Sequence, residues 1–189
     1  MHALFFEMRP KPGHLDHYFD HVARLRPVLD RHRGLVFLER YGSLSDPDLL
    51  LSHQLWDSEE AIAGWRADAQ HRRSQTAGRT VHFADYRIRV GERIWHRAPG
   101  TATTESRADV AASRSCVLAL YGTRPLTDGG LSAFESFTRK GRYISLGAFE
   151  TPSRAHDVIA RGELIGVDEM ALYGIHRDYG QFDRSEAPD

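Results

Sequence analysis

The chain of 189 residues has 25 basic and 26 acidic side chains, and its formal net charge is -1. This balance leaves no domain-wide positive field for a phosphate backbone, so nucleic acid is not an expected partner. Hydrophobic residues make up 41% and charged residues 27%, which predicts a globular chain with a real core and excludes compositional disorder. The apolar run between Met1 and Glu7 is too short for a signal peptide or a membrane span. We therefore expect a cytoplasmic protein without a membrane partner.

The chain opens with a predicted strand and an amphipathic helix. Residues 3–8 are rich in apolar side chains and are followed by a cluster of helix and strand breakers, Pro10, Pro12 and Gly13. Apolar side chains then recur at three- and four-residue steps and predict one buried helix stripe, made of Leu15, Tyr18, Phe19, Val22, Leu25 and Leu29.

Two strands, a second helix and a final strand complete the first half of the chain. Residues 35–41 and 49–56 have the pattern of strands joined by a hairpin loop rich in turn residues. Asp57 is the expected cap of a helix that ends at Gly78, and a strand follows over about residues 81–90. The predicted order is therefore β-α-β-β-α-β.

A second, weaker copy of this unit follows a linker. We divide the chain into a first domain over residues 1–95, a linker over 96–114 with few large apolar side chains, and a second, shortened domain over 115–189. The repeat is most specific where residues 51–58, LSHQLWDS, match residues 144–151, ISLGAFET. In each copy this segment leads from a predicted strand into a predicted helix.

The second copy is too short to hold the first helix of the unit. Only residues 125–134 stand where the first copy uses residues 10–38 for a full helix and its flanks. We therefore expect a hydrophobic strip of the second sheet to be left uncovered. Because large exposed apolar patches usually mark interfaces, this strip predicts a homodimer joined through the second lobe.

Several motifs resemble those of the antibiotic biosynthesis monooxygenase (ABM) family. The resemblance is carried by the run WDSEEAI at residues 56–62, by Trp65-Arg66, and by His71, Gln75, Gly78-Arg79, Phe83 and Asp85-Tyr86-Arg87. It implies the α+β class, with ferredoxin-like lobes whose antiparallel sheets are covered by helices and pair as a dimeric α+β barrel. Because this chain has two copies, we expect the barrel to be intramolecular.

The resemblance also implies a choice of chemistries. Family enzymes are oxygenases of quinol or anthrone-like aromatic substrates that use no metal or flavin, or haem-degrading monooxygenases, and many members have no known activity. The first type would hold an asparagine and a tyrosine where this chain has Ser52 and Ile62, so only Trp56 carries over. The second type would hold its iron-ligating histidine near Gln75 and leaves only Trp65 in common, so no haem or other cofactor is expected.

Strand periodicity places candidate site residues on two faces of the strand 49–56. Ser52, Gln54 and Trp56 share one face, and His53 lies on the other. Ser52 and Gln54 could bind a substrate oxygen beside Trp56 as a flat wall, or they could satisfy buried backbone groups. His53 is either a general base kept neutral by burial or a structural histidine bonded to a carbonyl.

A second group of candidates lies on and after the second predicted helix. His71 and Gln75 are one helical turn apart and Arg79 follows the helix end, so they could converge on an anion or a quinone oxygen, or bond the end of the helix. The catalytic candidates are thus His53, His71 and Trp56. The substrate-binding candidates are Ser52, Gln54, Trp65, Gln75, Arg79 and Tyr86.

No metal or nucleotide site is expected. His14, His17 and His21 recur at steps that can hold a transition metal, but no carboxylate completes a rigid set, and we interpret them as a solvated helix face. The glycines show no phosphate-binding pattern after a strand, so a nucleotide cofactor is unsupported.

The sequence thus predicts a cofactor-independent monooxygenase in natural-product tailoring. Dioxygen would react directly with the phenolate or enolate of an aromatic polyketide, quinol or anthrone-like substrate, which serves as its own reductant. The alternative is a non-catalytic protein of this fold that holds a small apolar or aromatic molecule. The two hypotheses differ in whether His53 or His71 points into a closed apolar cavity.

Overall fold

The structure is a computed structural model that describes residues 1–105 and 115–188. The first half of the chain forms β1 (His2–Pro10), α1 (Leu15–Leu29), β2 (Leu35–Ser43), β3 (Leu50–Trp56), α2 (Glu59–Ala67), α3 (Ala69–Ala77), the π-helical turn η1 (Gly78–His82) and β4 (Phe83–Arg97). The second half forms β5 (Thr104–Glu105), β6 (Cys116–Gly122), β7 (Ser132–Ser136), β8 (Tyr143–Phe149), α4 (Pro152–Arg161) and β9 (Val167–Gly180).

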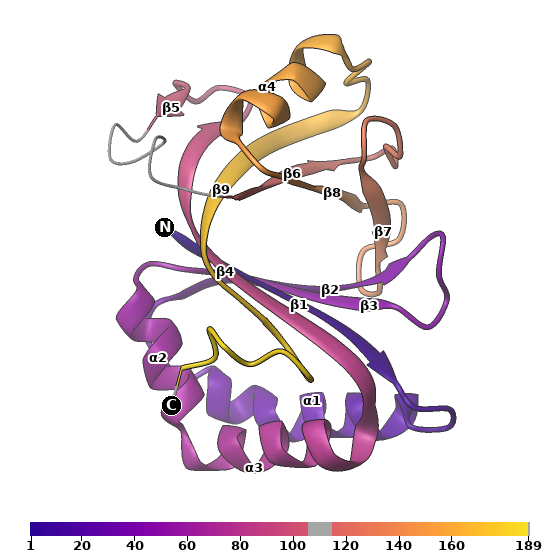
Figure 1. The fold of residues 1–189 in the computed structure, drawn as a ribbon, viewed down its shortest axis with the longest axis vertical. Helices are drawn as coiled ribbons and strands as arrows, with labels where there is room; N and C mark the ends of the chain where they lie inside the picture. The colour runs from indigo at the N-terminus through magenta and orange to yellow at the C-terminus, as the bar shows by residue number, and fades with distance from the viewer. Residues whose placement is uncertain (106–114, 189) are drawn as a thin grey trace.

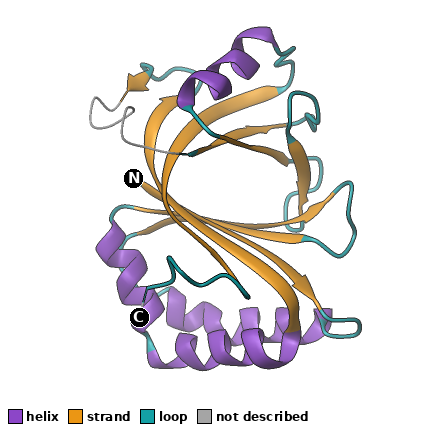
Figure 2. Ribbon diagram, in the orientation of Figure 1, coloured by secondary structure: helices purple, strands orange, loops and turns teal. Residues whose placement is uncertain are grey.

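The strands close into one antiparallel barrel with helices on its outside (Figure 1). Hydrogen-bonded neighbours follow the order β1-β3-β2-β7-β8-β6-β9-β4, and β4 pairs again with β1 to close the ring. Helices α1, α2 and α3 lie at one end of the molecule and α4 at the other (Figure 2). In the described residues, no helix is long and apolar enough to cross a membrane. The predicted α+β class, with two lobes that share a barrel inside one chain, is confirmed.

Two seams join the halves of the barrel. At one seam β2 pairs with β7 from Tyr41 to Ser43, and at the other the long strands β4 and β9 pair from Arg87 to Arg97. The interior is filled by apolar side chains of both halves, including Phe5, Leu51, Val117, Phe134, Ile144 and Tyr173, all at most 1% exposed. Each half therefore supplies part of the core that the other half needs.

The strand faces alternate as the sequence predicts. Phe5 of β1 and Leu51 of β3 point into the barrel, and Leu4 and Gln54 line a cavity on the outer face under the helices. This alternation follows from the two-residue period of a strand. It separates the barrel core from the space where a ligand could bind.

The second predicted helix is two helices, and its cap is one residue later than predicted. Ser58, not Asp57, is the N-cap of α2, because its backbone is extended and its hydroxyl accepts a hydrogen bond from the Ala61 N–H. Asp68 interrupts the helix with an extended ψ of 133°, and its carboxylate accepts the N–H groups of Gln70 and His71 at the start of α3. A side-chain cap of this kind satisfies donors that a new helix leaves open.

The repeat between the halves is visible in equivalent caps. β3 leads into α2 through Ser58, and β8 leads into α4 through Thr151, whose side chain likewise accepts the N–H of the residue three positions on, Arg154. The matched segments 51–58 and 144–151 therefore have the same local structure.

The second half lacks the first helix of the unit, as predicted, but the expected uncovered strip is not found. Cys116, Leu118 and Leu120 on the outer face of β6 are at most 2% exposed. Leu126 and Leu131 of the loop between β6 and β7 pack on this face together with α4. A loop with well-spaced leucines takes the place of the helix, and the homodimer predicted from sequence loses the support of this strip.

Two boundaries differ from those predicted. The strand expected over residues 81–90 begins at Phe83 and continues to Arg97, so His96 and Arg97 belong to β4 and not to the linker. Thr104 and Glu105 add a short strand to the edge of β4. Residues 106–114 of the predicted linker lie outside the described residues.

Candidate active site

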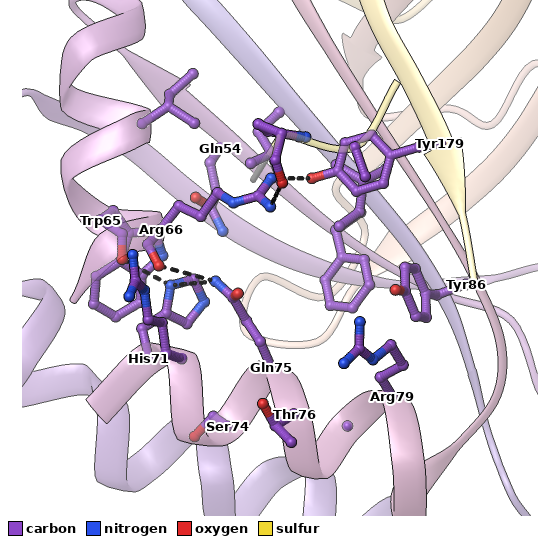
Figure 3. A pocket seen from close by; sticks show the side chains of 18 of the residues that line it. Gln54, Trp65, Arg66, His71, Ser74, Gln75, Thr76, Arg79, Tyr86 and Tyr179 are labelled. Atoms are coloured by element: carbon purple, nitrogen blue, oxygen red, sulfur yellow. Dashed lines mark hydrogen bonds between the residues drawn. The ribbon is translucent and has the colours of Figure 1, made fainter. Parts of the chain in front are cut away.

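A cavity of about 800 Å³ lies between the outer face of the first-half sheet and helices α1, α2 and α3. Figure 3 shows side chains from α2, α3 and the strands converging on it, with the C-terminal segment alongside. Its walls are largely apolar and aromatic, and they include Leu4, Phe6, Val22, Leu25, Ile62, Phe83, Ile88 and Val90. A pocket of this size suits a small organic molecule.

Trp65 and His71 form a stacked pair in the wall of the cavity. Their ring centroids are 3.9 Å apart and the rings are within 13° of parallel. The His71 Nδ1 atom lies 2.9 Å from the Trp65 carbonyl oxygen. Because a carbonyl only accepts hydrogen bonds, Nδ1 carries the proton and Nε2 is left as the basic nitrogen.

Burial fixes the charge state of this histidine. It lowers the His71 pKa from 6.5 to about 4, and the nearby Trp65 carbonyl and the Asp68 carboxylate offset only part of that effect. The ring is therefore neutral at pH 7. The helix break at Asp68 positions it, because the cap places His71 in the first turn of α3.

The charged groups that line the cavity are all cationic or titrate as cations. The described lining residues include five arginines, Arg66, Arg72, Arg79, Arg177 and Arg184, and neither an aspartate nor a glutamate. Such a lining attracts anions and raises their local concentration.

The C-terminal segment holds two of these arginines in place. Arg66 donates to the Tyr179 hydroxyl at 3.3 Å and also to the Pro188 carbonyl oxygen. Arg184 donates to the Tyr86 hydroxyl at 2.8 Å, and its guanidinium lies 5.9 Å from the centre of the Tyr179 ring. The end of the chain therefore forms part of the cavity wall.

Six of the nine candidate residues line the cavity: Gln54, Trp65, His71, Gln75, Arg79 and Tyr86. Ser52 lines a smaller adjoining pocket of about 90 Å³. Trp56 is fully buried behind the sheet face and donates from its indole Nε1 to the Gln54 Oε1 atom at 3.0 Å. This bond occupies the amide oxygen and leaves the Gln54 N–H groups as donors for a ligand.

Gln75 stands at the position where the haem-degrading members would hold their iron ligand. Its side chain is exposed, and its amide lies 3.0 Å from the His71 Nδ1 atom and 3.5 Å from the Arg66 carbonyl oxygen. A neutral amide held in this way is a poor iron ligand beside imidazole.

His53 lies on the opposite side of the sheet, inside the barrel and away from the cavity. It is fully buried and stacks on Phe5 with ring centroids 4.6 Å apart. Its Nδ1 atom lies 3.3 Å from the Leu4 carbonyl oxygen and its Nε2 atom 2.7 Å from the Tyr121 hydroxyl. The structure thus gives His53 the carbonyl bond of the structural alternative, and burial lowers its pKa to about 3.

Arg66, Arg177, Tyr179 and Arg184 are site residues that were not among the candidates. The family resemblance included Arg66, and the sequence offered no reason to place the C-terminal segment over the first helices. The only signal was the concentration of arginine and tyrosine near the chain end.

The barrel with its cavity under the helices defines a protein of the dimeric α+β barrel class in which both copies share one chain. A family model described as antibiotic biosynthesis monooxygenase matches residues 1–77. Jasmonate monooxygenase ABM of Pyricularia oryzae is 31% identical over 215 residues, which cover 100% of this chain and 97% of that relative. The chain therefore belongs to the antibiotic biosynthesis monooxygenase family.

Solved structures with a similar fold include two candidate monooxygenases. One from Fusobacterium nucleatum has a TM-score of 0.47 and 4% identity, and the match covers 94% of this chain and 93% of that chain. One from Deinococcus radiodurans has a TM-score of 0.45 and 17% identity over 56% of this chain and 99% of that chain.

Proposed function

We propose that the chain is a monooxygenase whose substrate is an apolar organic anion bound in the cavity. The observation that carries this proposal is the lining, which combines apolar walls with five arginines and no carboxylate among the described residues. A neutral substrate would gain nothing from so many cations, whereas a carboxylate, phenolate or enolate would pair with them.

The positions of the polar groups suggest how the substrate lies. Its anionic group would face Arg66 or Arg177, which come from α2 and β9, and its apolar body would pack against Phe6 and Ile88 of the sheet. Gln54 would donate to a substrate oxygen from the floor of the cavity. This arrangement brings the reacting carbon close to the Trp65 and His71 pair.

His71 is the proposed base, through its Nε2 atom. A neutral imidazole with a low pKa is a weak base, so the neighbouring guanidinium groups must stabilise the carbanion or phenolate that forms. Oxygen then adds to this electron-rich carbon. For a CH2 group the balance is R=CH2-type substrate RH2 plus O2 giving R=O plus H2O, in which the substrate supplies all the electrons.

Two substrate classes satisfy the same cavity and differ in their electron balance. An anthrone-like or quinol substrate of the aromatic polyketide class is its own reductant. A jasmonate, the substrate class in the name of the similar Pyricularia oryzae protein, is a carboxylate with an apolar body. Conversion of one of its C–H bonds to C–OH by O2 needs two further electrons and two protons from an added reductant.

Oxygen uptake distinguishes these classes. The purified protein is supplied with an anthrone or a jasmonate, each with and without NADPH, and 18O2 incorporation is measured by mass spectrometry. We expect one labelled oxygen atom in the product of one class. His71→Ala should lower kcat/KM by roughly 100- to 10,000-fold, and His156→Ala on α4 serves as the matched control.

A non-catalytic binding role is the alternative, and the low basicity of His71 is the observation that favours it. Saturable binding of either anion without oxygen uptake under any of these conditions would establish this alternative. Failure of both anions to bind would contradict the proposed cavity ligand altogether.

A further inference from the structure

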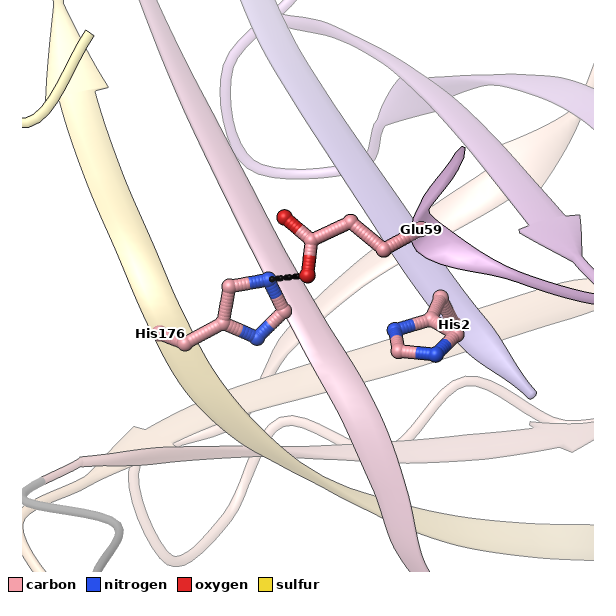
Figure 4. Close-up of side chains that lie close together, drawn as sticks. All are labelled: His2, Glu59 and His176. Atoms are coloured by element: carbon pink, nitrogen blue, oxygen red, sulfur yellow. Dashed lines mark ion pairs between the residues drawn. The ribbon is translucent and has the colours of Figure 1, made fainter. Parts of the chain in front are cut away.

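Three potential metal ligands lie together at the junction of β1, α2 and β9 (Figure 4). His2 is near the start of β1, Glu59 is the first residue of α2, and His176 is near the end of β9. One ligand atom from each residue can be chosen so that all three lie within 4.8 Å of one another. In the described residues, this is the group of three such side chains that is close enough to share an ion.

A break in strand register presents His176 to the other two. In the pairing of β9 with β4, Arg177 lies opposite Val90 and Ile175 lies opposite Gly91, so His176 has no partner residue. An extra residue of this kind is a β-bulge, which re-aims a side chain and often occurs beside functional sites.

The hydrogen bonds of the cluster leave ligand positions unused. The Nδ1 atom of His2 is buried and has no hydrogen-bond partner in the structure. A buried polar atom without a partner is costly unless something satisfies it. An ion at this site would do so.

Glu59 is held in the orientation that a ligand needs. Its Oε1 atom lies 2.6 Å from the Arg177 Nη2 atom, and its Oε2 atom lies 3.3 Å from the His176 Nε2 atom. Partners outside the ligand set commonly orient a ligating carboxylate in this way and fix its charge.

We propose that His2, Glu59 and His176 bind a divalent transition-metal ion of the zinc type. Two imidazole nitrogens and one carboxylate oxygen match the ligand preference of zinc and its neighbours in the first row, whereas calcium and magnesium take oxygen ligands. The proposal is independent of the proposed monooxygenase, because none of the three ligands lines the cavity.

The role that follows from the placement is stabilisation of the fold. The ligands come from positions 2, 59 and 176, and the bound ion would tie the first strand and the second helix to the last strand. An ion that binds only the folded chain raises the Tm, by roughly 5–10 °C at a free concentration one hundred times Kd for a chain of this size.

A second histidine cluster provides the control. His14, His17 and His21 of the first helix region gather around His82, with ring centroids 5.1 to 5.5 Å apart. No carboxylate completes this set among the groups close enough to share an ion. The His14 Nδ1 atom is already 3.0 Å from the His82 Nδ1 atom, and the His21 Nδ1 atom is 3.2 Å from the Ser74 hydroxyl.

The test uses the full chain with its native N-terminus and without a polyhistidine tag. Zn²⁺ is titrated by calorimetry, Co²⁺ by its visible absorption, and Tm is measured with Zn²⁺ and with Mg²⁺. We expect one equivalent of Zn²⁺ to bind, a Co²⁺ spectrum of a low-coordinate nitrogen and oxygen site, and a rise in Tm with Zn²⁺ but not with Mg²⁺.

Variants assign the site. His176→Ala and Glu59→Gln should each weaken Zn²⁺ binding at least tenfold and remove the rise in Tm, while His17→Ala should change neither. His176 is exposed, so the metal-free His176→Ala protein should keep the Tm of the metal-free parent. Unchanged binding in His176→Ala, loss of binding in His17→Ala, or no binding by the parent chain would overturn the proposal.

Discussion

The Nε2 atom of His53 lies 2.7 Å from the hydroxyl oxygen of Tyr121, although the two residues are 68 positions apart and belong to different halves of the chain. The Tyr121 oxygen is in turn 3.4 Å from the Tyr173 hydroxyl, and the His53 Nδ1 atom is 3.3 Å from the Leu4 carbonyl oxygen. One chain of hydrogen bonds therefore crosses the barrel interior, and each of its members is buried or nearly so.

The first prediction concerns this chain of bonds. Tyr121→Phe leaves the buried His53 Nε2 atom without its donor, and the free energy of unfolding should fall by about 1–3 kcal/mol. Urea unfolding at pH 7.5 measures this change. Tyr173→Phe, which removes only the longer 3.4 Å contact, should cost less. Equal stability of Tyr121→Phe and the parent would show that the bond contributes nothing.

The second prediction concerns acid stability. Burial lowers the His53 pKa from 6.5 to about 3, so the unfolded chain binds a proton below pH 6.5 that the folded chain refuses. Stability is complete above pH 6.5 and is lost as the pH falls toward 3, by about 1.4 kcal/mol per pH unit for this one group. His71, with a pKa of about 4, adds a similar loss over a narrower range.

Urea unfolding between pH 7.5 and 4.5 tests this sign and slope. The double variant His53→Phe with Tyr121→Phe removes both partners of the bond, so neither is left unsatisfied, and its stability should depend less steeply on pH than that of the parent. A double variant with the same pH slope would assign the acid sensitivity to other groups.

The third prediction concerns the pH dependence of the proposed reaction. If His71 is the base, kcat/KM should be flat from pH 7.5 to about 5 and should fall as the pH drops through about 4, since only the neutral ring accepts a proton. Circular dichroism at each pH confirms that the chain is folded. A limb near pH 6.5 would point to an unburied histidine instead.

The fourth prediction concerns recognition of the anion. Arg66→Gln removes a cation from the cavity wall and should weaken binding of a carboxylate or phenolate ligand by at least tenfold, because hydrogen bonds to charged groups contribute about 1.5–3 kcal/mol. The methyl ester of the same ligand should bind equally to variant and parent. Arg154→Gln on the exposed side of α4 is the charge-matched control. An equal loss of affinity for acid and ester would indicate damage to the cavity shape.

The fifth prediction concerns oligomeric state. The barrel closes within one chain, and the outer face of β6 is covered by α4 and by Leu126 and Leu131. We therefore expect light scattering at micromolar concentration to give a monomer of 21.4 kDa. A mass of twice this value would restore the homodimer predicted from sequence and would require another interface.

The candidate site was only partly predictable. Gln54 was placed on the helix-covered face by strand alternation, and His71 and Gln75 were placed together by helical spacing, and all three line the cavity. His53 shows the limit of such reasoning. Alternation correctly put it on the other face, but only the barrel shows that this face is core, because the second half of the chain packs against it.

The sequence by itself determined the local elements, because they depend on spacing, turn residues and caps within a few positions. It predicted β-α-β-β-α-β in the first half, the repeat at residues 51–58 and 144–151, and the missing helix of the second half. Tertiary structure alone decided which surfaces meet. It brought Arg177 and Tyr179 to the cavity, gathered His2, Glu59 and His176 at one junction, and covered β6 with a loop. These contacts join residues up to 174 positions apart, and strand pairing and packing fix them rather than any pattern along the chain.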